Sequence, residues 1–141
     1  MLGLWYLVFC TNNHKVKSMV LLAESENYIV SHEYETVTLR NKITHEEVII
    51  GDFYGDPDLA VISKDEKFCV MGGCRIVVYF LQEPFEEYHY NLETPQWKEL
   101  GRTPSNIIWV KNIKLLDEQY IEIEKENGEL MKLNVFSTEI L

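Results

Sequence analysis

The chain has 141 residues, which fits a single domain spanning 1–141. Hydrophobic residues make up 46% and aromatic residues 12%, so the composition excludes a disordered chain and favours β-sheet. With 23 acidic and 13 basic residues the formal charge is −10, which argues against binding to nucleic acid or to an anionic membrane and favours a basic protein partner.

Residues 1–10, MLGLWYLVFC, open the chain with an apolar run. No Lys or Arg precedes this run and no small-residue cleavage site follows it, which argues against a signal peptide. The run is also too short to span a membrane. We therefore expect residues 2–9 to form a first, buried strand. The three cysteines, an odd number, suit reduced thiols, so the sequence predicts a cytoplasmic protein with no membrane partner.

Short apolar or alternating runs, separated by turn residues, fill the rest of the chain. They predict strands over residues 16–23, 27–32, 35–40, 47–50, 59–63, 67–71, 74–81, 96–100, 107–111, 120–125 and 129–135. Residues 111–119 could hold one short helical turn, and no stretch predicts a helix of three turns. The expected fold is therefore all-β, with antiparallel hairpins forming a sandwich or a partial, about three-blade, propeller-like arrangement.

The sequence GDFYGDPD, residues 51–58, carries three carboxylates, Asp52, Asp56 and Asp58, near two glycines. Their spacing does not match a twelve-residue calcium loop, and no Glu follows at the required offset. A tight turn capped by Asp explains the pattern better. Together with Tyr54, these carboxylates form one predicted partner-binding patch.

Cys69 and Cys74 flank the Gly-Gly pair at 72–73 in the sequence FCVMGGCRIVVYF. A structural zinc site needs four ligands, commonly in paired short spacings, and the sequence has no second pair. A two-residue Gly-Gly turn instead predicts a hairpin in which Met71 faces Cys74 and Cys69 faces Ile76. The two cysteines would then share a face about 7–8 Å apart, too far for a disulfide. We expect free, buried cysteines and no metal.

The segment LQEPFEEYHYNLETPQW, residues 81–97, combines four glutamates with aromatic residues and contains no Lys or Arg. One interpretation is a solvated loop whose aromatic rings fold back onto the core. The other is a contact surface, in which carboxylates meet basic groups and exposed rings provide anchors. Under the second interpretation the partner-binding residues are Glu83, Phe85, Glu86, Glu87, Tyr88 and Tyr90.

The last predicted hairpin has a testable register. If residues 126–128 form a three-residue loop with its glycine at the bulge position, Ile123 faces Met131 on an apolar side and Glu122 faces Lys132 on a charged side. A two-residue loop would set Ile123 against Lys132. We therefore prefer the three-residue loop.

Signatures of catalysis are weak in this sequence. The four histidines lack zinc or triad spacing, and neither a G-x-S-x-G elbow nor a phosphate-binding glycine loop is present. We predict a protein that is not an enzyme, with no catalytic residues and no cofactor.

Two family resemblances follow from these motifs. The run LAVISKDEKFCVMGGCRIVVYFL, followed by QWKEL, resembles one blade of a WD-type propeller. The longer stretch IIGDFYGDPDLAVISKDEKFCVMGGCRIVVYFL, residues 49–81, resembles small cytoplasmic immunity proteins of bacterial polymorphic toxin systems, including contact-dependent growth inhibition. The matching motifs are the GDFYGDP turn, the AVISK strand end and the Gly-Gly hairpin.

The immunity-protein resemblance implies a protein that binds one cognate toxin, one to one, and blocks its active site without chemistry of its own. Nuclease toxins have basic clefts for the phosphate backbone, and an acidic, aromatic surface could fill such a cleft. The alternative, from the propeller resemblance, is a scaffold or ligand-binding module in a larger assembly.

Overall fold

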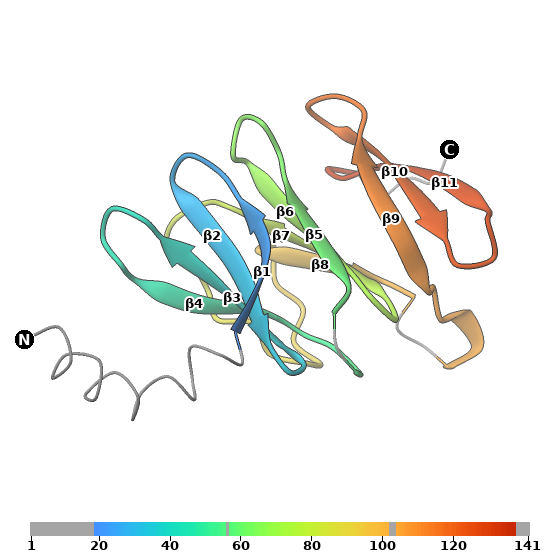
Figure 1. Cartoon of the computed structure of the whole chain (residues 1–141), viewed down its shortest axis with the longest axis horizontal. Helices are drawn as coiled ribbons and strands as arrows, with labels where there is room; N and C mark the ends of the chain where they lie inside the picture. Colours follow the sequence, from blue (N-terminus) through green and yellow to red (C-terminus); the bar gives the residue numbers. More distant parts are fainter. Residues whose placement is uncertain (1–18, 56, 102–103, 138–141) are drawn as a thin grey trace, which may run out of the picture.

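The computed structural model (Figure 1) describes residues 19–55, 57–101 and 104–137. These residues form eleven strands and one short 3₁₀ helix, η1 (Pro104–Asn106), with no α-helix among them. The strands are β1 (Met19–Glu24), β2 (Tyr28–Glu33), β3 (Thr36–Asn41), β4 (Glu47–Asp52), β5 (Leu59–Ile62), β6 (Phe68–Gly72), β7 (Ile76–Phe80), β8 (Trp97–Leu100), β9 (Val110–Leu115), β10 (Tyr120–Lys125) and β11 (Leu130–Asn134). The all-β prediction is confirmed.

The strands build three antiparallel sheets, each formed by consecutive strands of the chain. Their orders are β1-β2-β3-β4, β5-β6-β7-β8 and β11-β10-β9. The first strands of neighbouring sheets, β1 with β5 and β5 with β9, are in contact, and the sheets follow one another across the molecule (Figure 1). Three antiparallel sheets in series are consistent with the predicted sandwich or partial, about three-blade, propeller-like arrangement.

The middle sheet is buried on both faces. Residues 68–72 of β6 are all buried, and only the last residue of β7 is partly exposed. Alternate side chains of these strands point to opposite faces, so Cys69 and Met71 join the core shared with the first sheet, whereas Phe68 and Val70 join the core shared with the third. This double burial explains why β6 and β7 are apolar throughout rather than alternating.

The predicted register of the last hairpin is confirmed. Ile123 faces Met131 and Glu122 faces Lys132, across a loop in which Gly128 adopts a φ of 91°. Ile123 is fully buried, whereas Lys132 is exposed. The left-handed conformation of Gly128 and the alternation of apolar residues therefore both favour the register with the three-residue loop.

The predicted register of the cysteine hairpin is wrong. Gly72 pairs with Ile76, so Met71 faces Val77 and Cys69 faces Tyr79 rather than Ile76. The loop is residues 73–75, and Cys74 lies in it instead of on the face of Cys69. Gly72 stays in the strand because β9 of the third sheet packs directly on it: a Cβ placed there would lie 2.8 Å from Val110.

Strand β9 was predicted with the wrong bounds: the expected strand covered residues 107–111, and residues 111–119 were left open to one short helical turn, whereas β9 runs from Val110 to Leu115. A β-bulge in β9 leaves Lys111 without a partner opposite Glu124 and Lys125 of β10, and Lys111 and Asn112 both face solvent. The buried residues Val110 and Ile113 are consequently three positions apart, which imitates helical spacing. The strand expected over residues 2–9 lies outside the described residues.

Candidate functional site

Residues 81–96, the acidic loop, connect β7 to β8, and internal hydrogen bonds hold their backbone in place. The Tyr79 hydroxyl donates to the Glu86 carbonyl at 2.5 Å, and the Glu86 N–H donates to Gln96 Oε1 at 3.1 Å. Gln96 Nε2 donates in turn to the Phe80 carbonyl at 2.6 Å. Burial, and then the charge of Glu86, raises the pKa of Tyr79, so its hydroxyl stays protonated and keeps donating. The long loop is therefore fixed at its middle as well as at its ends.

Tyr88 was predicted to offer an exposed ring to a partner, but in the structure it is buried. Its side chain is only 4% exposed and packs on Trp97 with ring centroids 5.1 Å apart. Its N–H donates to the Ile49 carbonyl of β4 at 2.8 Å, which draws the loop against that strand. Phe85 is half-buried and contacts the ring of Tyr28 at 6.1 Å. For these two residues the rings fold back onto the core, because a large ring gains more by leaving water than by facing it.

The other predicted residues of the acidic loop are at the surface. Glu83, Glu86 and Glu87 are all exposed. Tyr90 is 55% exposed, and so offers part of its ring to a partner. The loop thus displays carboxylates outward while two of its aromatic side chains hold it to the body of the molecule.

The second predicted patch lies on the connection between β4 and β5. Asp52 and Asp58 are exposed, and Tyr54 is 88% exposed. The Asp58 N–H donates to the Gly72 carbonyl at 2.8 Å, so this connection is a turn fixed to the middle sheet. Asp56 lies outside the described residues.

Arg75 connects the two predicted patches, and sequence analysis did not single it out. Arg75 is only 5% exposed, and its guanidinium donates to the Asp52 carbonyl and, at 3.1 Å, to the Tyr88 hydroxyl. It also lies over two rings, with its central carbon 5.2 Å from the centroid of Phe53 and 5.6 Å from that of Tyr90. The available signal was a lone arginine directly after a Gly-Gly-Cys turn in an otherwise apolar hairpin.

The Arg75 network continues toward β8. The Tyr88 hydroxyl, which accepts from Arg75, donates to the Glu99 carboxylate. A buried cation and a half-buried carboxylate are thereby linked through one phenol, and each has a hydrogen-bonding partner as such groups require. The structure therefore brings Asp52 and Tyr90 to one site, together with Tyr88 beneath them.

Glu83 and Phe85 lie apart from that site, at the start of the acidic loop. They line a groove beside the β3–β4 hairpin together with Val48, Glu46 and Glu47. The three glutamates give this groove a strongly negative rim above an apolar wall. Glu46 and Glu47 were not predicted, because their proximity to Glu83 depends on how the loop returns to the first sheet.

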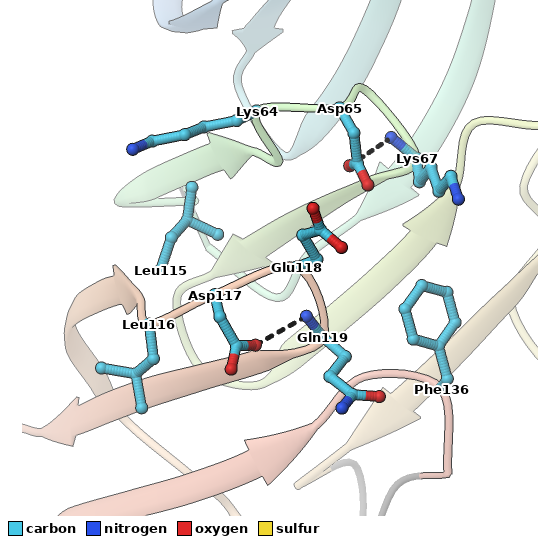
Figure 2. A pocket seen from close by; sticks show the side chains of 9 residues that line it. All are labelled: Lys64, Asp65, Lys67, Leu115, Leu116, Asp117, Glu118, Gln119 and Phe136. Carbon is cyan, nitrogen blue, oxygen red and sulfur yellow. Dashed lines mark hydrogen bonds between the residues drawn. The ribbon is translucent and has the colours of Figure 1, made fainter.

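A separate hollow lies between the β5–β6 and β9–β10 turns (Figure 2). Its lining is Lys64, Asp65, Lys67, Leu115, Leu116, Asp117, Glu118, Gln119 and Phe136. Two of its carboxylates accept hydrogen bonds from the backbone of the turns in which they lie. Asp65 accepts from the Lys67 N–H at 3.3 Å, and Asp117 accepts from the Gln119 N–H at 2.9 Å. Backbone hydrogen bonds from Gln119 and Tyr120 lower the pKa of Asp117. None of the predicted contact residues lines this hollow, and its charges are of both signs.

Cys69 and Cys74 are both free, but only Cys69 is buried as expected; Cys74, in the β6–β7 loop, is half-buried. Burial raises the pKa of the Cys69 thiol to about 12, which makes it a poor nucleophile. Within residues 19–55, 57–101 and 104–137, no three His, Cys, Asp or Glu side chains are placed to share a metal ion. The described part of the chain also contains no helix with the length and apolar character needed to cross a bilayer.

No protein-family model matches the chain, and no curated protein matches its sequence. These comparisons assign no role to the residues described above.

Proposed function

We propose that this protein is a cytoplasmic immunity protein, which binds a cognate secreted toxin one to one and inhibits it by covering a basic active-site cleft. The toxin is a nuclease in this proposal, because a cleft built for a phosphate backbone carries the positive charge that this surface complements. Inhibition requires no catalytic residue, metal or cofactor from the inhibitor.

The observation that carries the proposal is the fixed acidic loop. Glu83, Glu86 and Glu87 are exposed on a backbone held by Tyr79 and Gln96. A loop whose backbone is held before binding loses less conformational entropy when a partner arrives, and its carboxylates steer the partner's approach. A loop that served only to connect two strands would need neither the net negative charge nor the internal hydrogen bonds.

The aromatic contacts in this proposal differ from those expected at first. Tyr54 and Tyr90 supply the exposed rings, whereas Tyr88 and Phe85 support the loop from below. Arg75 links the Asp52 and Tyr90 regions into one surface through its contacts with both. Exposed tyrosines beside carboxylates suit a partner rich in arginine, because the guanidinium can stack on a ring while it pairs with an acid.

The second candidate is a scaffold or ligand-binding module in a larger assembly. The three-sheet, propeller-like arrangement supports it, since such sheets often serve as platforms for protein contacts. A scaffold would bind its neighbour without inhibiting an enzymatic activity, which separates the two candidates experimentally.

The test begins with capture of a partner from the native host and its identification. The proposal expects a toxin nuclease whose activity falls to zero at one equivalent of this protein, and whose toxicity is relieved by co-expression. A partner without toxic activity, or one that stays active in the complex, contradicts the immunity function and favours the scaffold.

The charge contribution is tested with the triple variant Glu83→Gln, Glu86→Gln, Glu87→Gln. We expect its association rate constant with the toxin at low salt to fall about tenfold, because electrostatic steering is lost. The matched control is Glu118→Gln, Glu126→Gln, Glu129→Gln, which removes the same charge from the exposed ends of the third sheet. Equal rates for the two triple variants, or a wild-type rate indifferent to salt, would contradict steering by the acidic loop.

A further inference from the structure

The β2–β3 turn carries an aromatic residue in an unusual backbone conformation. Tyr34, which begins this two-residue turn, has a φ of 54°, and its side chain is 72% exposed. Left-handed backbone is disfavoured for bulky residues, and a two-residue hairpin turn normally uses Gly, Asn or Asp there. His32 Nδ1 donates to the Tyr34 carbonyl at 2.9 Å, and the Phe53 N–H donates to the Glu35 carbonyl at 2.9 Å. The turn is therefore held in place while the ring itself extends into solvent.

A groove lies beside this turn on the face of the first sheet that points away from the middle sheet. The strand registers place four side chains in one row across it: Met19 faces Glu33, Glu33 faces Thr36, and Thr36 faces Asp52. Thr38 and the turn residues Tyr34 and Glu35 complete the lining. The groove thus combines carboxylates on three strands or turns, an aromatic ring and the apolar surface of Met19, and no basic side chain among the described residues lines it.

We propose that this groove receives an arginine side chain of the basic partner, an inference that rests on the proposed function and names a specific part of the partner. The guanidinium would pair with the carboxylates of Glu35 and Asp52 and stack on the ring of Tyr34. The alkyl part would lie along Met19 and Thr36. Charge complementarity selects a cation, and the adjacent ring selects arginine over lysine, because a planar guanidinium stacks where an ammonium does not.

The groove adjoins the predicted contact surface. Asp52 belongs to both, since its side chain lines the groove and its carbonyl accepts from Arg75 beneath Tyr90. The β2–β3 turn and the β4–β5 connection lie together at the lower edge of the molecule in Figure 1, joined by the Phe53–Glu35 hydrogen bond. A single basic partner could therefore contact Tyr34, Tyr54 and Tyr90 at once.

The groove is tested with a small probe and needs no knowledge of the partner. N-acetyl-arginine amide is titrated into the ¹⁵N-labelled protein, with N-acetyl-citrulline amide as a neutral probe of nearly the same shape. We expect arginine to shift the amide signals of residues 33–38 and 52 at millimolar concentration, and citrulline to leave them in place. Equal shifts with both probes, or arginine shifts spread evenly over all acidic surfaces, would overturn the proposal.

The ring is tested with Tyr34→Asn, which removes it and relieves the backbone. A merely structural role for the ring predicts a lower melting temperature. Our proposal predicts a melting temperature raised by about 3 °C, with arginine affinity reduced about fivefold through loss of the cation–π contact. The control Leu130→Asn removes an exposed apolar side chain from β11 and should leave the arginine shifts unchanged.

The outcomes also separate this inference from the proposed function. If Tyr34→Asn binds the arginine probe as tightly as the wild type, the proposal that this groove receives arginine is overturned, even if the protein inhibits a toxin. Loss of arginine affinity, combined with a partner that is not a toxin, supports the groove and contradicts the immunity function.

Discussion

At the scale of single residues, Glu66 shows how one carboxylate joins two sheets. It lies in the β5–β6 turn of the middle sheet and accepts hydrogen bonds from the β1–β2 turn of the first. The donors are the Ser25 hydroxyl, the Asn27 N–H at 2.9 Å and Asn27 Nδ2 at 2.7 Å. Burial alone would raise the pKa of Glu66, but these hydrogen bonds and the charge of Lys42 outweigh it, and the pKa lies below its ordinary value of 4.5. The charged form is therefore the one that holds the turns together.

Glu66→Gln should lower the free energy of unfolding at pH 7 by about 1 kcal/mol, because an amide forms weaker hydrogen bonds than a carboxylate and accepts fewer. A folded-state pKa below the unfolded one stabilises the protein above pH 4.5, and this stabilisation is lost as the pH falls through the folded-state pKa. Urea unfolding of both proteins from pH 7 downward should thus show their difference shrinking below pH 4.5. Glu126→Gln, on an exposed turn, is the control. A difference independent of pH would contradict this role of the charge.

At the scale of elements, the packing of β9 on β6 depends on the absence of a side chain at Gly72. A Cβ there would lie 2.8 Å from one Val110 carbon and 3.1 Å from a carbon of Ile113. The same close approach is secured by the Val110 N–H, which donates to the Gly73 carbonyl at 2.9 Å. The contact between β6 of the middle sheet and β9 of the third sheet therefore requires a glycine at position 72.

Gly72→Ala should destabilise the protein by about 1–3 kcal/mol, because the added methyl group forces β9 away from β6. Val110→Ala makes room for that methyl group, so the double variant should lose less stability than the sum of the two single variants. Chemical unfolding of the wild type and the three variants measures this coupling. Additive losses would mean that Gly72 and Val110 do not compete for the same space.

At the scale of the whole molecule, the three sheets are not equivalent. The middle sheet contacts a neighbour on each face, whereas, among the described residues, the third sheet contributes one face to a core. The opposite face of the third sheet carries Lys114, Glu122 and Lys132 in one row across its strands. Such a charged row suits contact with water, so the series of packed sheets ends there.

The difference in burial between the middle and third sheets predicts which backbone amides exchange their hydrogens most slowly. The amides of Val70 in β6 and Val78 in β7 should exchange at least about tenfold more slowly than those of Leu133 in the edge strand β11, because their release requires opening both cores. Ile123 of β10 is the informative comparison, since it is equally buried but belongs to a sheet with one buried face. Protection of Ile123 and Leu133 equal to that of Val70 would instead indicate that the whole molecule opens as one unit.

Much of the fold could be predicted from local patterns. Strands β1–β8, β10 and β11 fall within a few residues of the runs that apolar alternation and turn residues indicated. Strand β9 was predicted too early in the chain, because it contains a bulge that disrupts its alternation. The acidic character of the loop at 81–96 was evident as well, because it depends on composition alone.

The orientation of individual site residues could not be predicted in the same way. Tyr88 and Tyr90 are two positions apart in one loop, yet the first is buried and the second is 55% exposed. That difference follows from the Tyr88 contacts with Trp97, Ile49 and Arg75. No periodicity within the loop specifies these contacts.

The sequence by itself determined the all-β class, the negative charge and the register of the last hairpin, where Gly128 and the alternation of Ile121 and Ile123 act over a few neighbouring residues. Only the tertiary structure decided that Gly72 belongs to a strand, that Arg75 joins Asp52 to Tyr88, and that Glu46 lies near Glu83. The physical reason is separation along the chain. Arg75 and Asp52 are 23 positions apart, so their contact exists only because packed sheets bring two turns together.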